Sequence, residues 1–454
     1  MTHYGEATNA DPRNAPHSLE YQPPRAWLPR ALVLVALLAA FNFYLLGFAG
    51  RSSRDNAEQD ALASVLLWIS TVPLVGYVVR RPRTVPFFPA VCVVYGIYLA
   101  LPRFTSRPLF SGSSMRASPD RITLALVVAL IGVTMLIVGH FVGSHLFKRL
   151  PRLSRDIDLS VAVPWLAGCA ILVLADPSVI GLRALGQIPS AFTELGELSL
   201  AGLFLAYLRR QVGVWVTVYM FGLVMVRVVI GLGSGLLSAA GLPLIPLAFV
   251  FAWERRTVPW GFLAVSLLCL VVLGTGKSAF RAKYWTRSGQ SGGRLSNGIG
   301  YLNITRETVM KSDPGDLLTA TTERTNMLAT LTFVTSETPA HVPYWDGYTL
   351  QDIPWHWIPR ILVPEKPAHS FGQEFPRRYG LIDYADTGTA FNMPELVELY
   401  INFGIAGVLV GMALIGAFYS LVSHVLGGGA SGALIASCLF TGMLLVEGDI
   451  GTTL

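Results

Sequence analysis

The chain has 454 residues, of which 52% are hydrophobic and only 14% are charged, and its formal net charge is +6. Soluble domains carry about 25% charged residues, so this composition excludes a soluble globular protein. The basic residues are spread over short connections between apolar runs, a distribution that encodes membrane orientation and argues against nucleic-acid binding.

The apolar residues form runs of about 20, which is the length of helix that crosses a hydrocarbon core of about 30 Å. Because backbone polar groups cannot stay unpaired in that core, the spans should be helical. The sequence therefore predicts an all-α polytopic integral membrane protein with about 11 transmembrane helices (10–12). In chain order, the predicted spans are residues 28–49, 61–79, 85–102, 122–147, 159–176, 189–208, 212–232, 235–253, 258–276, 394–422 and 431–448. Glu194 and Glu197 interrupt the sixth span, for which a re-entrant segment is the alternative.

Residues 1–26 are polar and rich in Pro and Asn, and they are expected to stay as an N-terminal tail because no cleavable signal peptide precedes the first span. The Lys and Arg residues of alternate connections number 14 on the side of this tail and 7 on the other side. Since positive charge accumulates on the cytoplasmic side, the bias places the N-terminus in the cytoplasm. The segment after the ninth span and, with an odd number of spans, the C-terminus are then extracytoplasmic.

The predicted organisation has four parts: a cytoplasmic tail (1–26), helices one to nine (27–276), a large extracytoplasmic loop (277–391) and the C-terminal helices (392–454). The loop holds 12 basic, 11 acidic and 15 aromatic residues. Helical periodicity predicts amphipathic helices at 299–311 and 315–336, and the Pro-, Gly- and aromatic-rich remainder predicts irregular chain packed on the helices below. A loop of this length is uncommon unless it is functional, so it is the expected location of an active site.

Cations at the outer membrane boundary are the first candidate site residues. Arg227 falls in the outer third of the seventh span, and Lys277 and Arg281 follow the ninth span on the same face. Charges inside a span usually face a cavity, and guanidinium groups match the geometry of phosphate oxygens. These residues therefore predict a site for a lipid-linked pyrophosphate, with snorkelling towards lipid headgroups as the alternative.

A second candidate is the polar face at the start of the tenth span. Glu395, Glu398 and Asn402 follow Pro394 at spacings of three and four, which places them on one helix face. Carboxylates near a helix N-terminus are electrostatically favoured, so helix capping is the alternative. Glu398 lies deeper in the span and is the stronger candidate for lining a site.

The large loop also supplies histidines and aromatic residues. His356 and His369, like His341, are candidates for a general base that deprotonates a sugar hydroxyl, with a structural role as the alternative. Flat rings suit the apolar faces of sugars and also the aromatic belt at a membrane boundary; the residues concerned are Tyr344, Trp345, Tyr348, Trp355 and Trp357. The spacing of Cys and His residues matches no metal motif, so neither a metal nor a disulfide framework is predicted.

Two runs near the end of the loop resemble a known family. Residues 358–367 read IPRILVPEKP, and they are followed by Gly372, by Thr389 and by NMPELVELYINFGIAG at 392–407. This succession resembles the bacterial oligosaccharide repeat-unit polymerases, the Wzy-type O-antigen and exopolysaccharide polymerases, over about residues 320–420.

The resemblance implies a GT-C-like membrane glycosyltransferase without a nucleotide sugar, a cofactor or an obligatory metal. Such enzymes act on the outer face of the bacterial cytoplasmic membrane and transfer a growing glycan from undecaprenyl pyrophosphate to a lipid-linked repeat unit, in some cases with a chain-length regulator protein. The residues expected to bind the pyrophosphate are Arg227, Lys277, Arg281, Arg324 and Arg360. The expected sugar-binding residues are Tyr344, Trp345, Trp355, Trp357 and Asn402. The base is His356, His369 or Glu398.

Two other classes remain as alternatives. An O-antigen ligase differs from a polymerase only in its acceptor, and a polyprenyl-phosphate-sugar transferase would carry acidic residues in its first outer loop, which here is residues 51–60. A flippase or transporter would have charges deep in the bilayer, repeated halves and no large outer segment.

Overall fold

The structure is a computed structural model that describes residues 27–49, 56–105, 119–153, 158–175, 188–284, 293–311, 326–356, 363, 371–387, 389–444 and 448–453. Within these residues the regular secondary structure is entirely helical. The α-helices are α1 (Trp27–Ala49), α2 (Ala57–Arg80), α3 (Phe87–Leu99), α4 (Pro102–Thr105), α5 (Pro119–Leu146), α6 (Leu159–Ala170), α8 (Ile188–Leu208), α9 (Val214–Leu232), α10 (Leu237–Gly241), α11 (Ile245–Arg255), α12 (Trp260–Tyr284), α13 (Arg294–Val309), α15 (Met327–Glu337), α16 (Ile353–His356), α17 (Phe371–Arg378), α18 (Glu395–Val425), α19 (Ala430–Met443) and α20 (Ile450–Thr453). A 3-10 helix, η8 (Tyr348–Asp352), precedes α16.

Nine helical segments of the described chain are long and apolar enough to cross a membrane. Two shorter apolar segments, Leu159–Leu174 and Ala430–Met443, lie at the positions of the fifth and eleventh predicted spans. Helix therefore occurs at every predicted position, and the prediction of a polytopic all-α membrane protein is confirmed. The two short segments fall below the roughly 17–25 residues of a full crossing.

Two predicted spans were wrong in detail. α12 continues to Tyr284, eight residues beyond the predicted end at 276, because hydropathy detects the apolar part of a helix and not the end of its hydrogen-bond ladder. The eighth span consists of α10, a 3-10 turn and α11. Pro243 and Pro246 lie at this division, and proline has no backbone N–H with which to continue a helix.

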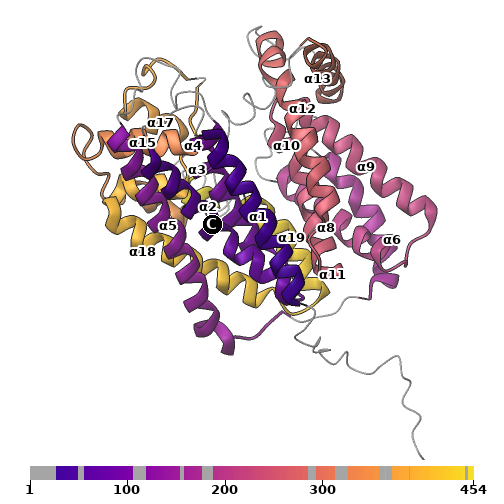
Figure 1. Cartoon of the computed structure of the whole chain (residues 1–454). Helices are drawn as coiled ribbons and strands as arrows, with labels where there is room; N and C mark the ends of the chain where they lie inside the picture. Colours follow the sequence, from indigo (N-terminus) through magenta and orange to yellow (C-terminus); the bar gives the residue numbers. More distant parts are fainter. Residues whose placement is uncertain are drawn as a thin grey trace, which may run out of the picture.

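The two longest helices, α5 and α18, pack side by side and run parallel, and both lie in the same half of the bundle in Figure 1. Gly139 and Gly143 of α5 face Ala413 and Ala417 of α18. A Cβ atom at Gly139 would lie 1.9 Å from the carbonyl oxygen of Ala413, so only glycine permits this approach. Small residues at a four-residue spacing bring membrane helices into backbone contact, and here they fix the two helices on which the rest of this half is built.

Replacing Gly139 by alanine is expected to destabilise the protein. The added methyl overlaps the backbone of α18, and overpacking of this kind costs about 1–3 kcal/mol. The melting temperature of the purified protein in detergent should fall. Gly222 of α9 is the matched control, because a Cβ atom there meets nothing within 4 Å; Gly222→Ala should leave the melting temperature unchanged or raise it, since alanine favours helix by about 1 kcal/mol. Equal effects of the two substitutions would contradict the close contact.

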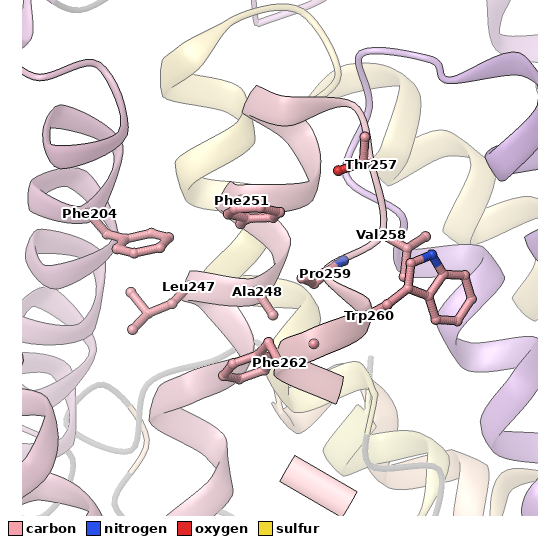
Figure 2. Close-up of a pocket in the computed structure, with 10 residues that line it drawn as sticks. Phe204, Leu247, Ala248, Phe251, Thr257, Val258, Pro259, Trp260 and Phe262 are labelled. Carbon is pink, nitrogen blue, oxygen red and sulfur yellow. The ribbon is translucent and has the colours of Figure 1, made fainter. Parts of the chain in front are cut away.

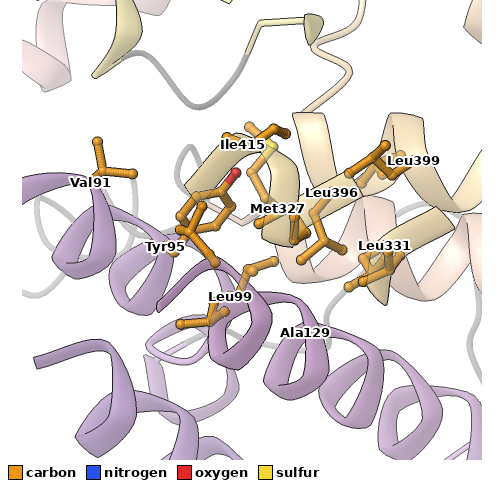
Figure 3. Close-up of a cluster of buried hydrophobic side chains, with 14 of the residues drawn as sticks. Val91, Tyr95, Leu99, Ala129, Met327, Leu331, Leu396, Leu399 and Ile415 are labelled. Carbon is orange, nitrogen blue, oxygen red and sulfur yellow. The ribbon is translucent and has the colours of Figure 1, made fainter. Parts of the chain in front are cut away.

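The second half of the predicted large loop is part of the main core and not a separate domain. Leu328 and Leu331 of α15 and Phe375 of α17 are fully buried in one cluster with residues of α3, α5 and α18. Figure 3 shows Leu331 beside Leu396 of α18, with Val91, Tyr95 and Leu99 of α3 to their left. The apolar faces of these short helices therefore bind the outer segment to the membrane helices.

The predicted helix boundaries in this region need correction. The helix expected at 299–311 is α13, which begins at Arg294, and the helix expected at 315–336 is described only as α15. Residues 337–391 are not wholly irregular, because they contain η8, α16 and α17. Helices this short are stabilised by tertiary burial and not by intrinsic propensity, so the sequence pattern did not reveal them.

The remaining helices form a second group. α6, α8, α9 and α11 share one set of buried apolar side chains, and α9, α10, α12 and α13 share another. Figure 1 shows this group beside the group of α1 to α5, α15, α17 and α18. α19 packs on α8 and α11 of the second group and also contacts α18, so it connects the two.

Candidate functional site

The outer end of α18 is a short half-helix. Pro394 has extended backbone (φ −57°, ψ 147°) and directly precedes the first helical residue, Glu395. The helix then breaks at Gly404, whose φ of 61° and ψ of −148° are not helical, and it continues to Val425 beyond the break. The segment from Glu395 to Asn402 is completely buried, so its polar side chains must find partners inside the protein.

Glu395 is fully buried and is held by two tyrosines. The hydroxyl of Tyr95 on α3 donates to its Oε2 at 2.6 Å, and the hydroxyl of Tyr419, further along α18, donates to its Oε1 at 2.9 Å. Both carboxylate oxygens are thus used in joining α3 to the two parts of α18. This arrangement gives Glu395 a structural role that differs from helix capping, because its partners are tyrosine side chains and not helix N–H groups.

Glu398 is also buried and lies where three segments meet. Its Oε2 accepts a hydrogen bond from the backbone N–H of Ile450 at 2.6 Å, and the hydroxyl of Thr349 is hydrogen-bonded to the same carboxylate. Asn402 donates from Nδ2 to Thr349 Oγ1 and to the backbone oxygen of Glu398, both at 2.8 Å, and its Oδ1 accepts from the N–H of Gly347 at 3.0 Å. We call Glu398, Asn402 and Thr349 the Glu398 cluster; it joins α18 to η8 and α20.

The aromatic residues above this cluster differ in exposure. Trp345 is only 4% exposed, and the guanidinium of Arg378 lies 4.6 Å from the centre of its ring. The backbone N–H of Trp345 also donates to the carbonyl of Ile401 at 3.1 Å, so this residue fixes the segment on α18. Tyr344 is only half-buried, beside Gly404. Of the two, Tyr344 has the more accessible ring for a sugar.

The break at Gly404 is expected to require glycine. Its backbone lies in a region that residues with a side chain rarely enter, and such conformations cost about 1–3 kcal/mol. A Cβ atom would also lie 2.7 Å from the hydroxyl of Tyr344. Gly404→Ala should therefore lower the melting temperature, and the double variant with Tyr344→Phe should recover only the part due to the clash. A Gly404→Ala variant as stable as the parent would show that the half-helix is not required.

Arg227 has an acidic partner that the sequence did not reveal. Its Nη2 lies 3.9 Å from Oε1 of Glu197 on α8, and the two side chains are only 14% and 17% exposed. A buried ion pair inside a membrane span is costly and usually marks a functional or interhelical contact. Glu197 also lies close enough to Cys438 of α19 to act on it electrostatically, so the pair sits beside the helix that connects the two groups.

Lys277 and Arg281 lie on α12 itself, which corrects the expectation that they follow the ninth span. α12 packs against α13, where the Tyr301 hydroxyl donates to the carbonyl of Leu273 at 2.8 Å and a Cβ atom at Gly276 would meet Thr305 at 2.2 Å. Both cations are partly buried in this contact. Their place on a rigid helix fixes their spacing, as a site for an anion requires.

Several predicted site residues lie outside the described residues. These are His369, Arg324, Arg360 and Trp357. For Trp355 and His356 the structure describes the backbone, at the end of α16, but not the side chains. His341 is 66% exposed and binds Glu337 at 3.0 Å, which is typical of a surface residue. In the described part of the chain, no group of His, Cys, Asp and Glu residues has the arrangement of a metal site.

The structure divides the predicted site residues that it describes into two sets. Glu398, Asn402, Tyr344 and Trp345 come together at the outer end of α18, whereas Arg227 and the α12 cations belong to the second helix group. The residues missed by sequence reasoning are Tyr95, Tyr419, Thr349 and, as the partner of Arg227, Glu197. The sequence did contain a signal for the pairing of Glu197 with Arg227. α8 and α9 are joined by a short turn, and these two residues lie at similar distances along the chain from that turn.

Together these features define a polytopic α-helical membrane protein. It has a buried polar cluster at the start of the broken helix α18 and a charged pair, Glu197–Arg227, between the neighbouring helices α8 and α9. The chain belongs to the family described as Domain of unknown function (DUF8712), which matches residues 158–446. The match begins at the N-cap of α6 and ends beyond α19, so it includes both sets of site residues but not α1 to α5. No protein of curated function and no solved structure matches the chain.

Proposed function

We propose that the protein is a GT-C-like membrane glycosyltransferase that polymerises lipid-linked oligosaccharide repeat units on the outer face of the bacterial cytoplasmic membrane. The resemblance of residues 358–367 and 392–407 to repeat-unit polymerases supports this function. The single structural observation that carries it is the Glu398 cluster, a buried carboxylate at the head of a half-helix beneath an aromatic-rich segment.

The proposed reaction needs a base for the acceptor. An acceptor sugar hydroxyl attacks the anomeric carbon of the donor glycan, and the new glycosidic bond forms as the bond from that carbon to the pyrophosphate oxygen breaks. The hydroxyl proton passes to the base, and undecaprenyl pyrophosphate leaves with the electron pair. General-base assistance contributes about 10²–10⁴-fold to such a step. Glu398 is the candidate whose carboxylate the structure describes; His356 and His369 remain alternatives.

The leaving group needs cations. A pyrophosphate is a stable leaving group when its charge is neutralised, so orientation and electrostatic stabilisation are the main tasks of the protein. Arg227, Lys277 and Arg281 are proposed for this task on α9 and α12, with Arg324 and Arg360 from the large segment. In this proposal Tyr344 contacts a sugar, and Asn402 positions η8 over Glu398 because both ends of its amide are already bonded.

One observation favours a second function. The buried Glu197–Arg227 pair is the kind of intramembrane charge that transporters use, so a polysaccharide flippase is the second candidate. The two functions differ in their demand on residues 340–391. A flippase should tolerate substitutions there, whereas a polymerase should lose chain extension. An O-antigen ligase would share the site and differ in the acceptor alone.

The test is the length of polymer on a gel from cells that carry Arg227→Ala, Arg360→Ala or His369→Ala in place of the parent protein. We expect shorter chains or single repeat units in at least two of the three variants, with Arg149→Ala, an exposed residue after α5, as the control. Protein levels are compared in the same membranes. Unchanged long-chain polymer in all three would contradict the proposed mechanism.

A further inference from the structure

A cavity of about 420 Å³ lies between α8, α11 and the start of α12, and no residue of the Glu398 cluster lines it. Its volume falls in the range of roughly 300–1,000 Å³ that is usual for sites of small ligands. Phe204, Leu247, Phe251 and Phe262 surround this space, and Trp260, which also lines it, lies on the side opposite Phe204 (Figure 2). Trp260 is 51% exposed, as expected of a tryptophan at a membrane boundary. The cavity is therefore an apolar groove that reaches the edge of the membrane.

The carboxylate of Glu254 connects the helix ends beside this cavity. Arg209 at the end of α8 donates from Nε and Nη2 to the two oxygens of Glu254 on α11, both at 3.1 Å. Arg83, before α3, lies 3.8 Å from the same carboxylate and 4.6 Å from the ring centre of Trp253. Glu254 is thus fully engaged by two arginines, and its charge is more than balanced.

Three further arginines lie at the ends of α8 and α11, the helices that line the groove. Arg255 and Arg256 directly precede the turn that lines it, and Arg210 follows α8; all three side chains are exposed. Arg255 also donates to the carbonyl of Leu208 at 3.2 Å, which keeps the two helix ends together. In the described part of the chain, no carboxylate lies within ion-pair distance of any of these three guanidinium groups. Among the described residues these three arginines therefore have no carboxylate partner, and this end of α8 and α11 carries an excess of positive charge.

Two of these arginines hold a backbone conformation that favours glycine. Arg210 has a φ of 58° and Arg256 a φ of 51°, both in the left-handed region, each just after a helix. Glycine is the usual residue at such a position because it has no Cβ atom to clash. The backbone alone thus gives no reason for arginine. A cation near a helix C-terminus is favourable, although this effect is small for exposed groups, and basic residues in cytoplasmic connections also set membrane orientation.

We propose that this groove binds an anionic phospholipid, with one acyl chain between α8 and α11 and the phosphate between Arg210, Arg255 and Arg256. The observations that carry the proposal are an apolar cavity beside the turn from α11 to α12 and three exposed arginines at the ends of α8 and α11 that have no carboxylate partner among the described residues. By the charge count, this end of the bundle faces the cytoplasm, where the leaflet is rich in anionic lipids. The site is independent of the proposed glycosyltransferase function and lies at the other end of the membrane.

The test compares lipids bound to the purified full-length protein. The protein is incubated in detergent with equal amounts of phosphatidylglycerol and phosphatidylethanolamine, and the bound lipids are counted by native mass spectrometry. The parent protein should retain phosphatidylglycerol selectively. Arg210→Gly/Arg256→Gly should reduce this binding by about 25-fold, since each basic residue contributes roughly fivefold. Because glycine suits both backbone positions, the melting temperature without lipid should be unchanged or higher.

A second variant tests the groove and not the charge. Ala248 lines the cavity on α11, so Ala248→Phe fills the space needed by the acyl chain and leaves all cations in place. This variant should also lose selective phosphatidylglycerol binding. Lys148→Gln/Arg149→Gln, which removes two exposed cations after α5, is the matched control and should bind lipid as the parent does.

Each other outcome overturns the proposal. Loss of binding in the arginine variant but not in Ala248→Phe would show that the arginines attract anionic headgroups in general and that the groove does not bind the acyl chain. Loss in the Lys148/Arg149 control would show that binding follows net charge. Equal retention of the two lipids by the parent protein would show apolar contact without headgroup recognition.

Discussion

Glu398→Gln is expected to reduce chain extension by about 10²–10⁴-fold, the contribution of a general base, while the protein remains folded. Glutamine has the same shape and keeps an oxygen that accepts the hydrogen bond from the Ile450 N–H, which in the parent measures 2.6 Å. The substitution therefore removes the capacity to take a proton and preserves the contact between α18 and α20. The measurement is the rate of polymer growth in membranes supplied with lipid-linked repeat units.

Glu395→Gln is the matched control for this prediction. Glu395 is as deeply buried and lies one turn away, but its two oxygens are bonded to tyrosines of the core. A glutamine amide can accept from one phenol and donate to the other, so we expect polymer growth within about threefold of the parent. Equal losses in the two glutamine variants would show that both carboxylates act in the core.

Glu398→Ala distinguishes the proposed catalytic role of Glu398 from its structural role as the acceptor for the Ile450 N–H. Alanine leaves the buried N–H of Ile450 without an acceptor, which costs about 1–3 kcal/mol. This variant should lose both stability and chain extension, whereas the glutamine variant should lose chain extension alone. If Glu398→Gln polymerises normally, the base lies elsewhere, and His356 and His369 are the next candidates.

Arg227→Gln is expected to destabilise the protein by about 3–5 kcal/mol, because it leaves the buried Glu197 carboxylate without its cation. The two side chains are largely covered by protein, so water cannot replace the lost partner. The double variant Arg227→Gln/Glu197→Gln removes both charges and should recover most of this stability. The measurement is the melting temperature of each purified variant in the same detergent.

The same double variant tests the role of Arg227 in the reaction. If the guanidinium binds pyrophosphate, the double variant should be stable and yet produce only short chains. If the pair only holds α8 to α9, recovery of stability should restore long chains as well. A single Arg227→Gln variant as stable as the parent would contradict the ion pair itself.

The positions of the apolar helices followed from the sequence because burial in lipid is decided locally, although only nine of the eleven predicted spans are long enough to cross a membrane in the described residues. A helix in hydrocarbon satisfies its own backbone, so about 20 apolar residues are sufficient to predict it. The ends of the helices were less predictable. α12 continues to Tyr284 through charged residues, because its hydrogen-bond ladder does not stop where hydropathy falls. Pro243 and Pro246 signalled the break before α11 in the sequence, whereas Gly404 gave no such sign, since glycine also occurs in unbroken membrane helices.

The candidate site could be predicted in residue type but not in pairing. Glu395 and Glu398 looked alike in sequence, three residues apart on one face of a predicted helix. In the structure, Glu395 is bonded to Tyr95, 300 positions away, and Glu398 to Ile450 on another segment. The pairing of Glu197 with Arg227 depends on more local features, because the short turn between α8 and α9 fixes which residues of the two helices lie opposite each other.

By itself the sequence determined that this is a membrane protein of many helices with a polar, aromatic-rich segment between its ninth and tenth predicted spans. These properties depend on composition and on the local period of the chain. Only the tertiary structure decided that Glu395 belongs to the core, that Glu398 lies under η8 and α20, and that Arg227 is paired. The physical reason is that hydropathy sets which residues leave water, whereas the partner of a buried charge depends on how distant helices pack.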